Sequence, residues 1–102
     1  MTLVLPDNIG TTVHLSAPTV ELVEDLRENT SELFKVLRGE EGGERMKQGV
    51  YDLAVKLINC NLDDFNTSAH ELATKYSMNM EHLQVFFTDY VNFVSEIQNA
   101  KN

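Results

Sequence analysis

The spacing of hydrophobic positions along the chain changes near Pro18. Before that residue, two short β-prone runs at 2–5 and 12–15 flank the turn-forming segment 6–11. We therefore predict a small β-hairpin arm over residues 1–16. Two strands alone are only marginally stable in water, so we expect this hairpin to lie against helices.

After the hairpin, apolar residues recur at steps of three and four, which is the period of an amphipathic α-helix. The pattern predicts helices over 17–38, 45–61, 67–77 and 79–99. The segment 39–44, "GEEGGE", has three glycines and no apolar side chain, so we predict a loop there that exchanges its amide hydrogens quickly. The apolar stripes that predict the first, second and last of these helices include, in that order, Leu26, Leu33 and Leu37; Val50, Leu53 and Leu57; and Leu83, Phe87 and Tyr90.

Local signals at three positions refine these helices. Ser68 and Glu71 have the spacing of a capping box, and Asn79 is suited to cap the last helix. Gly49 lies inside the second helix, where glycine costs about 1 kcal/mol relative to alanine. Close approach by a neighbouring helix would explain why glycine is kept at that position.

Two short helical patterns meet at a tight turn in "HELATKYSMNMEHLQVFF", residues 70–87. Ala73 is small where a second helix would cross the first, Ser77 stands at the turn, and Leu83 is an aliphatic anchor. With these residues, the segment 69–88 resembles the helix-turn-helix superfamily, although that family usually has glycine where this chain has Ser77. The resemblance implies two helices in contact through Ala73 and Leu83.

If the resemblance extends to function, the outward positions of the second helix would read base edges in DNA. These positions include Asn79, Glu81, Gln84 and Thr88. Asparagine and glutamine suit adenine edges, but residues 79–90 contain no lysine or arginine to neutralise phosphates. Direct DNA binding is therefore the disfavoured interpretation.

The charge of the chain favours a protein partner instead. It has 16 acidic and 8 basic side chains, with a formal net charge of -8, which repels nucleic acid and anionic lipid and favours basic proteins. The apolar belt on the last helix is wider than one packing stripe requires. We therefore predict that Met80, Val85 and Phe93 contact a partner or a second copy of the chain.

Signs of catalytic or metal chemistry are absent from the sequence. The three histidines lack the spacing of a zinc site, and Cys60 is the only cysteine, inside an apolar helical run. No glycine-rich loop is arranged to hold a phosphate. We predict a protein that is not an enzyme and needs no cofactor or metal. Because no apolar stretch approaches ~20 residues and no leader pattern is evident, we expect a cytoplasmic protein without a membrane segment.

Taken together, these patterns predict one domain over 1–102 of the mainly α class. We expect a small four-helix domain with a short N-terminal β-hairpin and a helix-turn-helix-like C-terminal half. The preferred function is that of a non-enzymatic acidic regulator or adaptor that binds another protein and can self-associate. Two alternatives stay open: a helix-turn-helix transcriptional regulator, and a phage- or mobile-element-encoded assembly factor or inhibitor.

Overall fold

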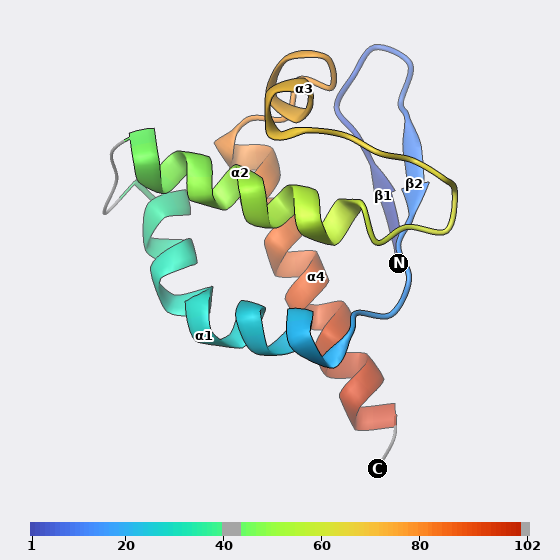
Figure 1. Cartoon of the computed structure of the whole chain (residues 1–102), viewed down its shortest axis with the longest axis vertical. Helices are drawn as coiled ribbons and strands as arrows, with labels where there is room; N and C mark the ends of the chain where they lie inside the picture. Colours follow the sequence, from blue (N-terminus) through green and yellow to red (C-terminus); the bar gives the residue numbers. More distant parts are fainter. Residues whose placement is uncertain (40–43, 101–102) are drawn as a thin grey trace.

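The computed structural model describes residues 1–39 and 44–100 (Figure 1). These residues form a short antiparallel hairpin followed by helices, which confirms the predicted fold class. The elements are β1 (Thr2–Val4), β2 (Thr12–His14), α1 (Val20–Leu37), α2 (Glu44–Ile58), α3 (Ala69–Thr74) and α4 (Met80–Ala100). The predicted fast-exchanging loop falls mainly on residues 40–43, which lie outside the described ranges.

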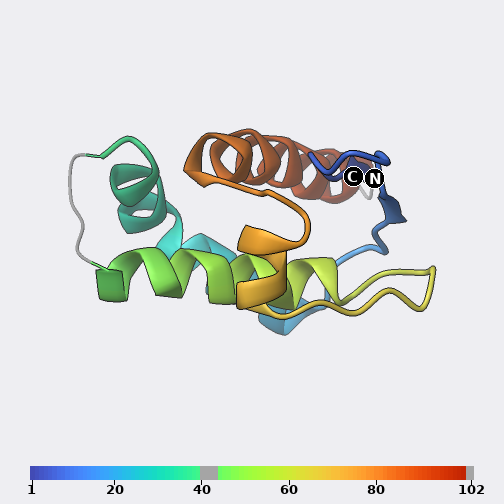
Figure 2. The same ribbon diagram turned by 90° about the horizontal axis from the view of Figure 1, so that it is seen from above.

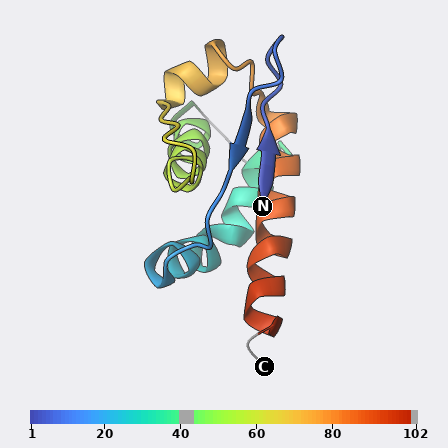
Figure 3. The same cartoon turned by 90° about the vertical axis from the view of Figure 1, so that its right-hand side faces the viewer.

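The elements are arranged in two layers with the hairpin at one side. Figure 3 shows α4 in one layer and α2 in the other, with α1 reaching from the α2 side toward α4, and the hairpin covers the space between α2 and α4. Seen from above in Figure 2, α3 packs beside α2 and the chain then turns into α4. The expectation that the hairpin lies against helices is therefore confirmed.

One hydrophobic core joins these layers. Its aromatic centre is on α4, where the ring of Phe86 lies 5.2 Å from that of Phe87 and 5.8 Å from that of Tyr90. The deepest residues come from β2, α2, α3 and α4 and from the segments that adjoin β1 and α4: Leu5, Val13, Leu57, Ile58, Leu72, Met78, Leu83, Phe86, Phe87 and Tyr90. Burial of these side chains, at roughly 25 cal/mol per Å² of apolar surface, is the main force that stabilises the fold.

Helix α2 ends at Ile58, three residues before the predicted end at 61, because two asparagine side chains bind the backbone beyond it. Asn59 exchanges two hydrogen bonds of 3.0 Å with the backbone of Thr67. The Asn61 side-chain oxygen accepts the N–H groups of Asp63 at 2.8 Å and Phe65 at 3.0 Å. Such side-chain bonds give the backbone an alternative to the helix.

The expected caps form at α3 and α4. The Ser68 hydroxyl accepts the N–H of Glu71 at 3.2 Å, as the capping box predicts. Asn79 accepts the N–H of His82 at 3.0 Å through its side-chain oxygen, and the Asn79 N–H donates to Nδ1 of His82 at 3.1 Å. Helix α4 therefore begins with a reciprocal cap in which histidine takes the place usually held by glutamate.

Candidate protein-binding surfaces

The segment that resembles a helix-turn-helix has a tight turn at Ser77, whose φ of 56° lies in the left-handed region that glycine adopts most easily. However, α3 spans only Ala69–Thr74, shorter than the predicted 67–77, and packs chiefly against α2. Ala73 is exposed, whereas Leu83 is fully buried. The prediction that Ala73 occupies a buried helix crossing is therefore wrong, because α3 turns that face toward solvent.

The four candidate DNA-reading residues differ in how far their polar groups are already engaged. Asn79 is occupied as the cap of α4. The Thr88 hydroxyl donates to the backbone oxygen of Gln84 at 2.8 Å, and the Gln84 side chain is half-buried. Glu81 is exposed but carries the same sign of charge as phosphate. A base contact by Asn79 would therefore have to break the helix cap.

The three candidate partner-binding residues do not form one patch. Val85 is 61% exposed and faces β1 across a groove. Met80 is half-buried and lines a different groove, together with Tyr51 of α2 and Ala73 of α3. Phe93 packs against the core, with its ring 6.0 Å from that of Tyr90. The apolar belt on α4 is thus divided between two grooves and the core.

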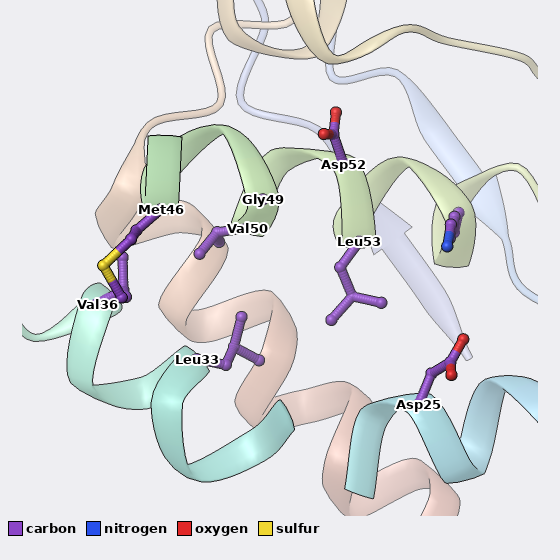
Figure 4. A pocket seen from close by; sticks show the side chains of 9 residues that line it. Asp25, Leu33, Val36, Met46, Gly49, Val50, Asp52 and Leu53 are labelled. Atoms are coloured by element: carbon purple, nitrogen blue, oxygen red, sulfur yellow. The ribbon is translucent and has the colours of Figure 1, made fainter. Parts of the chain in front are cut away.

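A larger apolar cleft, which periodicity did not indicate, lies between α1 and α2. Its volume is about 430 Å³. Figure 4 shows the side chains of Leu33, Val50 and Leu53 pointing into it, and Met46 of α2 and Val36 of α1 line it at one end. Met46 is 39% exposed even though it belongs to the apolar stripe of its helix. Of the five apolar side chains in the lining, Leu33, Val36 and Val50 are buried at its floor, and Met46 and Leu53 are the two that a partner could reach most easily.

The polar residues of this cleft stand at its rim. Asp25 lies on α1 at the end away from Met46, and Asp52 lies on α2 with its carboxylate turned away from α1 (Figure 4). Oδ1 of Asp52 accepts a hydrogen bond of 3.0 Å from the side-chain nitrogen of Gln48. Lys56 also lines the cleft. This arrangement suits an occupant with an apolar body and polar or charged edges.

Gly49 also lines this cleft, and its surroundings differ from those expected for a glycine inside a helix. A Cβ atom built on this glycine would meet no other heavy atom within 4 Å. The expectation that a neighbouring helix of the chain approaches it closely is therefore wrong. Its bare backbone instead faces the open cleft, where another molecule could approach closely.

The groove between β1 and α4 has a volume of about 220 Å³, which is smaller than that of the cleft between α1 and α2. Val4 of β1 and Val85 of α4 line it and are 62% and 61% exposed. The buried side chains of Leu3, Met78 and Phe86 contribute to its lining as well. The two exposed valines come from opposite ends of the chain, so no local pattern could have paired them.

The structure adds little that would support chemistry at these surfaces. Within residues 1–39 and 44–100, no group of three or more histidine, cysteine or acidic side chains is placed to hold a metal ion. Cys60 is a free, half-buried thiol. None of the described helices is both long enough and apolar enough to cross a bilayer. In comparisons with known protein families, curated proteins and solved structures, none matches this chain.

Proposed function

We propose that the protein is a small acidic regulator or adaptor that binds another protein and catalyses no reaction. The observation that carries this proposal is the apolar cleft between α1 and α2. Leu33, Val50 and Leu53 point into it from two helices, so an apolar side chain placed there would be enclosed on several sides (Figure 4). The floor of the cleft is the buried apolar surface of Leu33, Val36 and Val50, and Met46 and Leu53 at its side are partly exposed. Open clefts with an apolar lining and a few polar groups are the usual places where proteins bind other molecules.

The occupant that this cleft fits best is the apolar face of an amphipathic helix with basic residues along its edges. Such a helix lays its apolar side chains into a groove between two helices. Gly49 supports close approach of its backbone, because no side chain stands above that position. The formal net charge of -8 favours basic edges on the partner, since opposite charges steer association.

The alternative of a DNA-binding regulator has less support. The helix that would enter the major groove begins with a cap that occupies Asn79. Residues 76–100 contain no lysine or arginine, and basic contacts to phosphate supply most nonspecific affinity for DNA. A DNA-binding mode would therefore depend on a few base contacts from Gln84 and its neighbours.

The test compares wild-type protein with a variant whose cleft is filled, Gly49→Leu. The Cβ atom of leucine at this position would meet no other heavy atom within 4 Å, and leucine favours the helix more than glycine does. The fold should therefore persist, and a thermal unfolding curve checks this. Ser95→Leu, which adds the same side chain at an exposed position of α4, is the matched control. Each protein is immobilised, and bound proteins from source-cell lysate are identified by mass spectrometry.

We expect a basic partner that wild type and Ser95→Leu retain and that Gly49→Leu loses by about tenfold or more. Equal capture by all three proteins would refute the cleft as the docking site. Loss of self-association in Gly49→Leu, seen by light scattering, would instead make the occupant a second copy. A selection on random DNA duplexes that returned a consensus site, lost on Gln84→Ala, would overturn the proposal in favour of a DNA regulator.

A further inference from the structure

The hairpin presents backbone hydrogen-bonding groups along the outer edge of β1. Its register pairs Leu3 with Val13, and the Leu5 N–H donates to the Thr11 oxygen at 2.8 Å. In an antiparallel pair, directly opposed residues alternate between hydrogen-bonded and non-hydrogen-bonded pairs. Because positions 1, 3 and 5 bond to β2, the N–H and C=O groups of Thr2 and Val4 point away from it.

The opposite edge of this small sheet is covered by the chain itself. The Leu62 N–H donates to the His14 oxygen at 2.8 Å, and the His14 N–H donates to Oδ2 of Asp63 at 2.6 Å. Leu15 also forms an isolated bridge with Asn61. The segment after α2 therefore protects the edge of β2, and no element of the described chain pairs with the edge of β1.

Proteins usually protect an exposed strand edge by keeping the strand short or with charged side chains, proline or a covering element, because an open edge pairs readily with another strand. The strand β1, Thr2–Val4, is short, with 3 residues, but has neither a charged residue nor a proline. Beside it lies the groove whose walls carry the exposed side chains of Val4 and Val85. An open edge next to an apolar groove can provide both hydrogen bonds and a side-chain pocket for an added strand.

The charge around this groove indicates the kind of strand that fits it. One wall comes from the N-terminal segment and the other from α4, and residues 1–26 and 76–100 contain no lysine or arginine. Of the ionisable groups in these two segments, Asp89, His82 and Met1 line the groove. The N-terminal amine of Met1 donates to the Leu15 oxygen at 3.0 Å, which leaves Asp89 as the carboxylate available to an added strand. A strand that enters the groove would gain from lysine or arginine at its ends.

We propose that an extended segment of a basic protein adds to the edge of β1 as a third strand, in the groove between β1 and α4. Its backbone pairs with the N–H and C=O groups of Thr2 and Val4. One of its apolar side chains contacts Val4 and Val85, and a flanking lysine or arginine lies near Asp89. A second copy of this chain is a poor occupant, because its own β1 carries no basic residue. This surface is separate from the cleft between α1 and α2.

The experiment selects peptides from a display library of random ten-residue sequences against the full chain. We expect enrichment of peptides with alternating apolar side chains and terminal lysine or arginine, and amide chemical-shift changes at Thr2 and Val4 when such a peptide binds. Val4→Pro removes an outward N–H group without removing a bond to β2, so it should weaken binding by about tenfold or more. Thr12→Pro is the matched control. Thr12 is paired with Val4 across the hairpin, so this change introduces proline at the same level of the hairpin but on the edge of β2, away from the groove.

A second variant tests the groove without changing the hairpin, in case Val4→Pro unfolds it. Val85→Lys changes an exposed position of α4 and should leave thermal unfolding nearly unchanged, yet it should abolish binding of a basic peptide. Asp89→Asn should weaken binding a few-fold and make it less sensitive to salt. Equal binding by wild type, Val4→Pro and Val85→Lys would overturn the proposal, as would enrichment of acidic peptides or of none.

The cleft variant separates this inference from the proposed function. Gly49→Leu should bind the selected peptide as wild type does, because Gly49 does not line this groove. If no peptide is enriched while a Gly49-dependent partner is still captured, strand addition is wrong and the proposed function stands. Amide chemical-shift changes at Thr2 and Val4 that grow with the concentration of the protein alone, without peptide, would assign the edge of β1 to a second copy. That result would overturn the proposal of a basic protein as the occupant.

Discussion

The side chain of Asn59 exchanges two hydrogen bonds with the backbone of Thr67: its amide nitrogen donates to the Thr67 oxygen at 3.0 Å, and its oxygen accepts the Thr67 N–H at 3.0 Å. This pairing joins the end of α2 to the residues just before α3. It holds the intervening loop against the edge of β2, where Leu62 and Asp63 bind His14. One asparagine thereby positions a loop that closes one edge of the hairpin.

Replacing this asparagine should destabilise the fold. In Asn59→Ala the backbone groups of Thr67, a buried residue, lose both partners, and we expect a loss of about 1–3 kcal/mol in the free energy of unfolding. Urea denaturation followed by circular dichroism measures this change. Asn66→Ala, an exposed asparagine in the same loop, should change stability by less than ~0.5 kcal/mol. Similar losses in both variants would contradict the role given to Asn59.

Two tyrosines should respond in opposite ways to loss of the hydroxyl. The Tyr51 hydroxyl donates to the Met78 oxygen at 2.7 Å, so Tyr51→Phe should cost about 1 kcal/mol. The Tyr90 hydroxyl is buried and makes no hydrogen bond to the described residues. Tyr90→Phe should therefore be neutral or stabilising, because it removes a buried polar group without a partner. Thermal unfolding of both variants, measured side by side, tests this contrast.

The same burial predicts a loss of stability in alkali. Burial raises the pKa of Tyr90 to about 12, from an ordinary value of 10.0, because the phenolate is poorly solvated in the core. The folded state therefore holds the Tyr90 proton more tightly than the unfolded state does. The resulting contribution of Tyr90 to the free energy of unfolding is fully present below pH 10.0 and is lost as pH rises toward about 12. Unfolding curves across this range should show a smaller decline in Tyr90→Phe than in wild type.

Acid should weaken the contact between β2 and the loop that follows α2. Hydrogen bonds from the backbone N–H and the side chain of His14 lower the pKa of Asp63 below its ordinary value of 3.8. The contribution of Asp63 to the free energy of unfolding is therefore complete above pH 3.8 and is lost as pH falls through its lowered pKa. Carboxyl titration followed by NMR should place the pKa of Asp63 below 3.8, and the stability of Asp63→Asn should decline less steeply in acid.

The turn between α3 and α4 should accept glycine with a gain in stability. Ser77 has a φ of 56°, a conformation that costs a residue with a side chain roughly 1–2 kcal/mol. Ser77→Gly removes this strain but increases the freedom of the unfolded chain, so we expect a net gain of up to ~1 kcal/mol. Ser77→Val should be destabilising, because a β-branched residue is rarely left-handed. A stability order with valine above glycine would show that the turn has another conformation in solution.

The sequence by itself determined the features that depend on neighbours along the chain. The change from an alternating to a helical period near Pro18 separated the hairpin from the helices. The caps by Ser68 and Asn79 followed from spacing alone, since each side chain binds a backbone group three residues ahead. Local signals of this kind operate before any tertiary contact forms, which explains why they could be interpreted correctly.

Only the tertiary structure decided which faces of these elements are covered. The same period that placed Ala73 at a helix crossing could not show that α3 packs on α2 and leaves this residue exposed. Nor could it bring Val4 beside Val85, or show that Gly49 faces an open cleft. Periodicity gives the direction of an apolar stripe but not the element that meets it. That choice depends on how the whole chain buries its apolar surface, because the hydrophobic effect favours burial without specifying a partner.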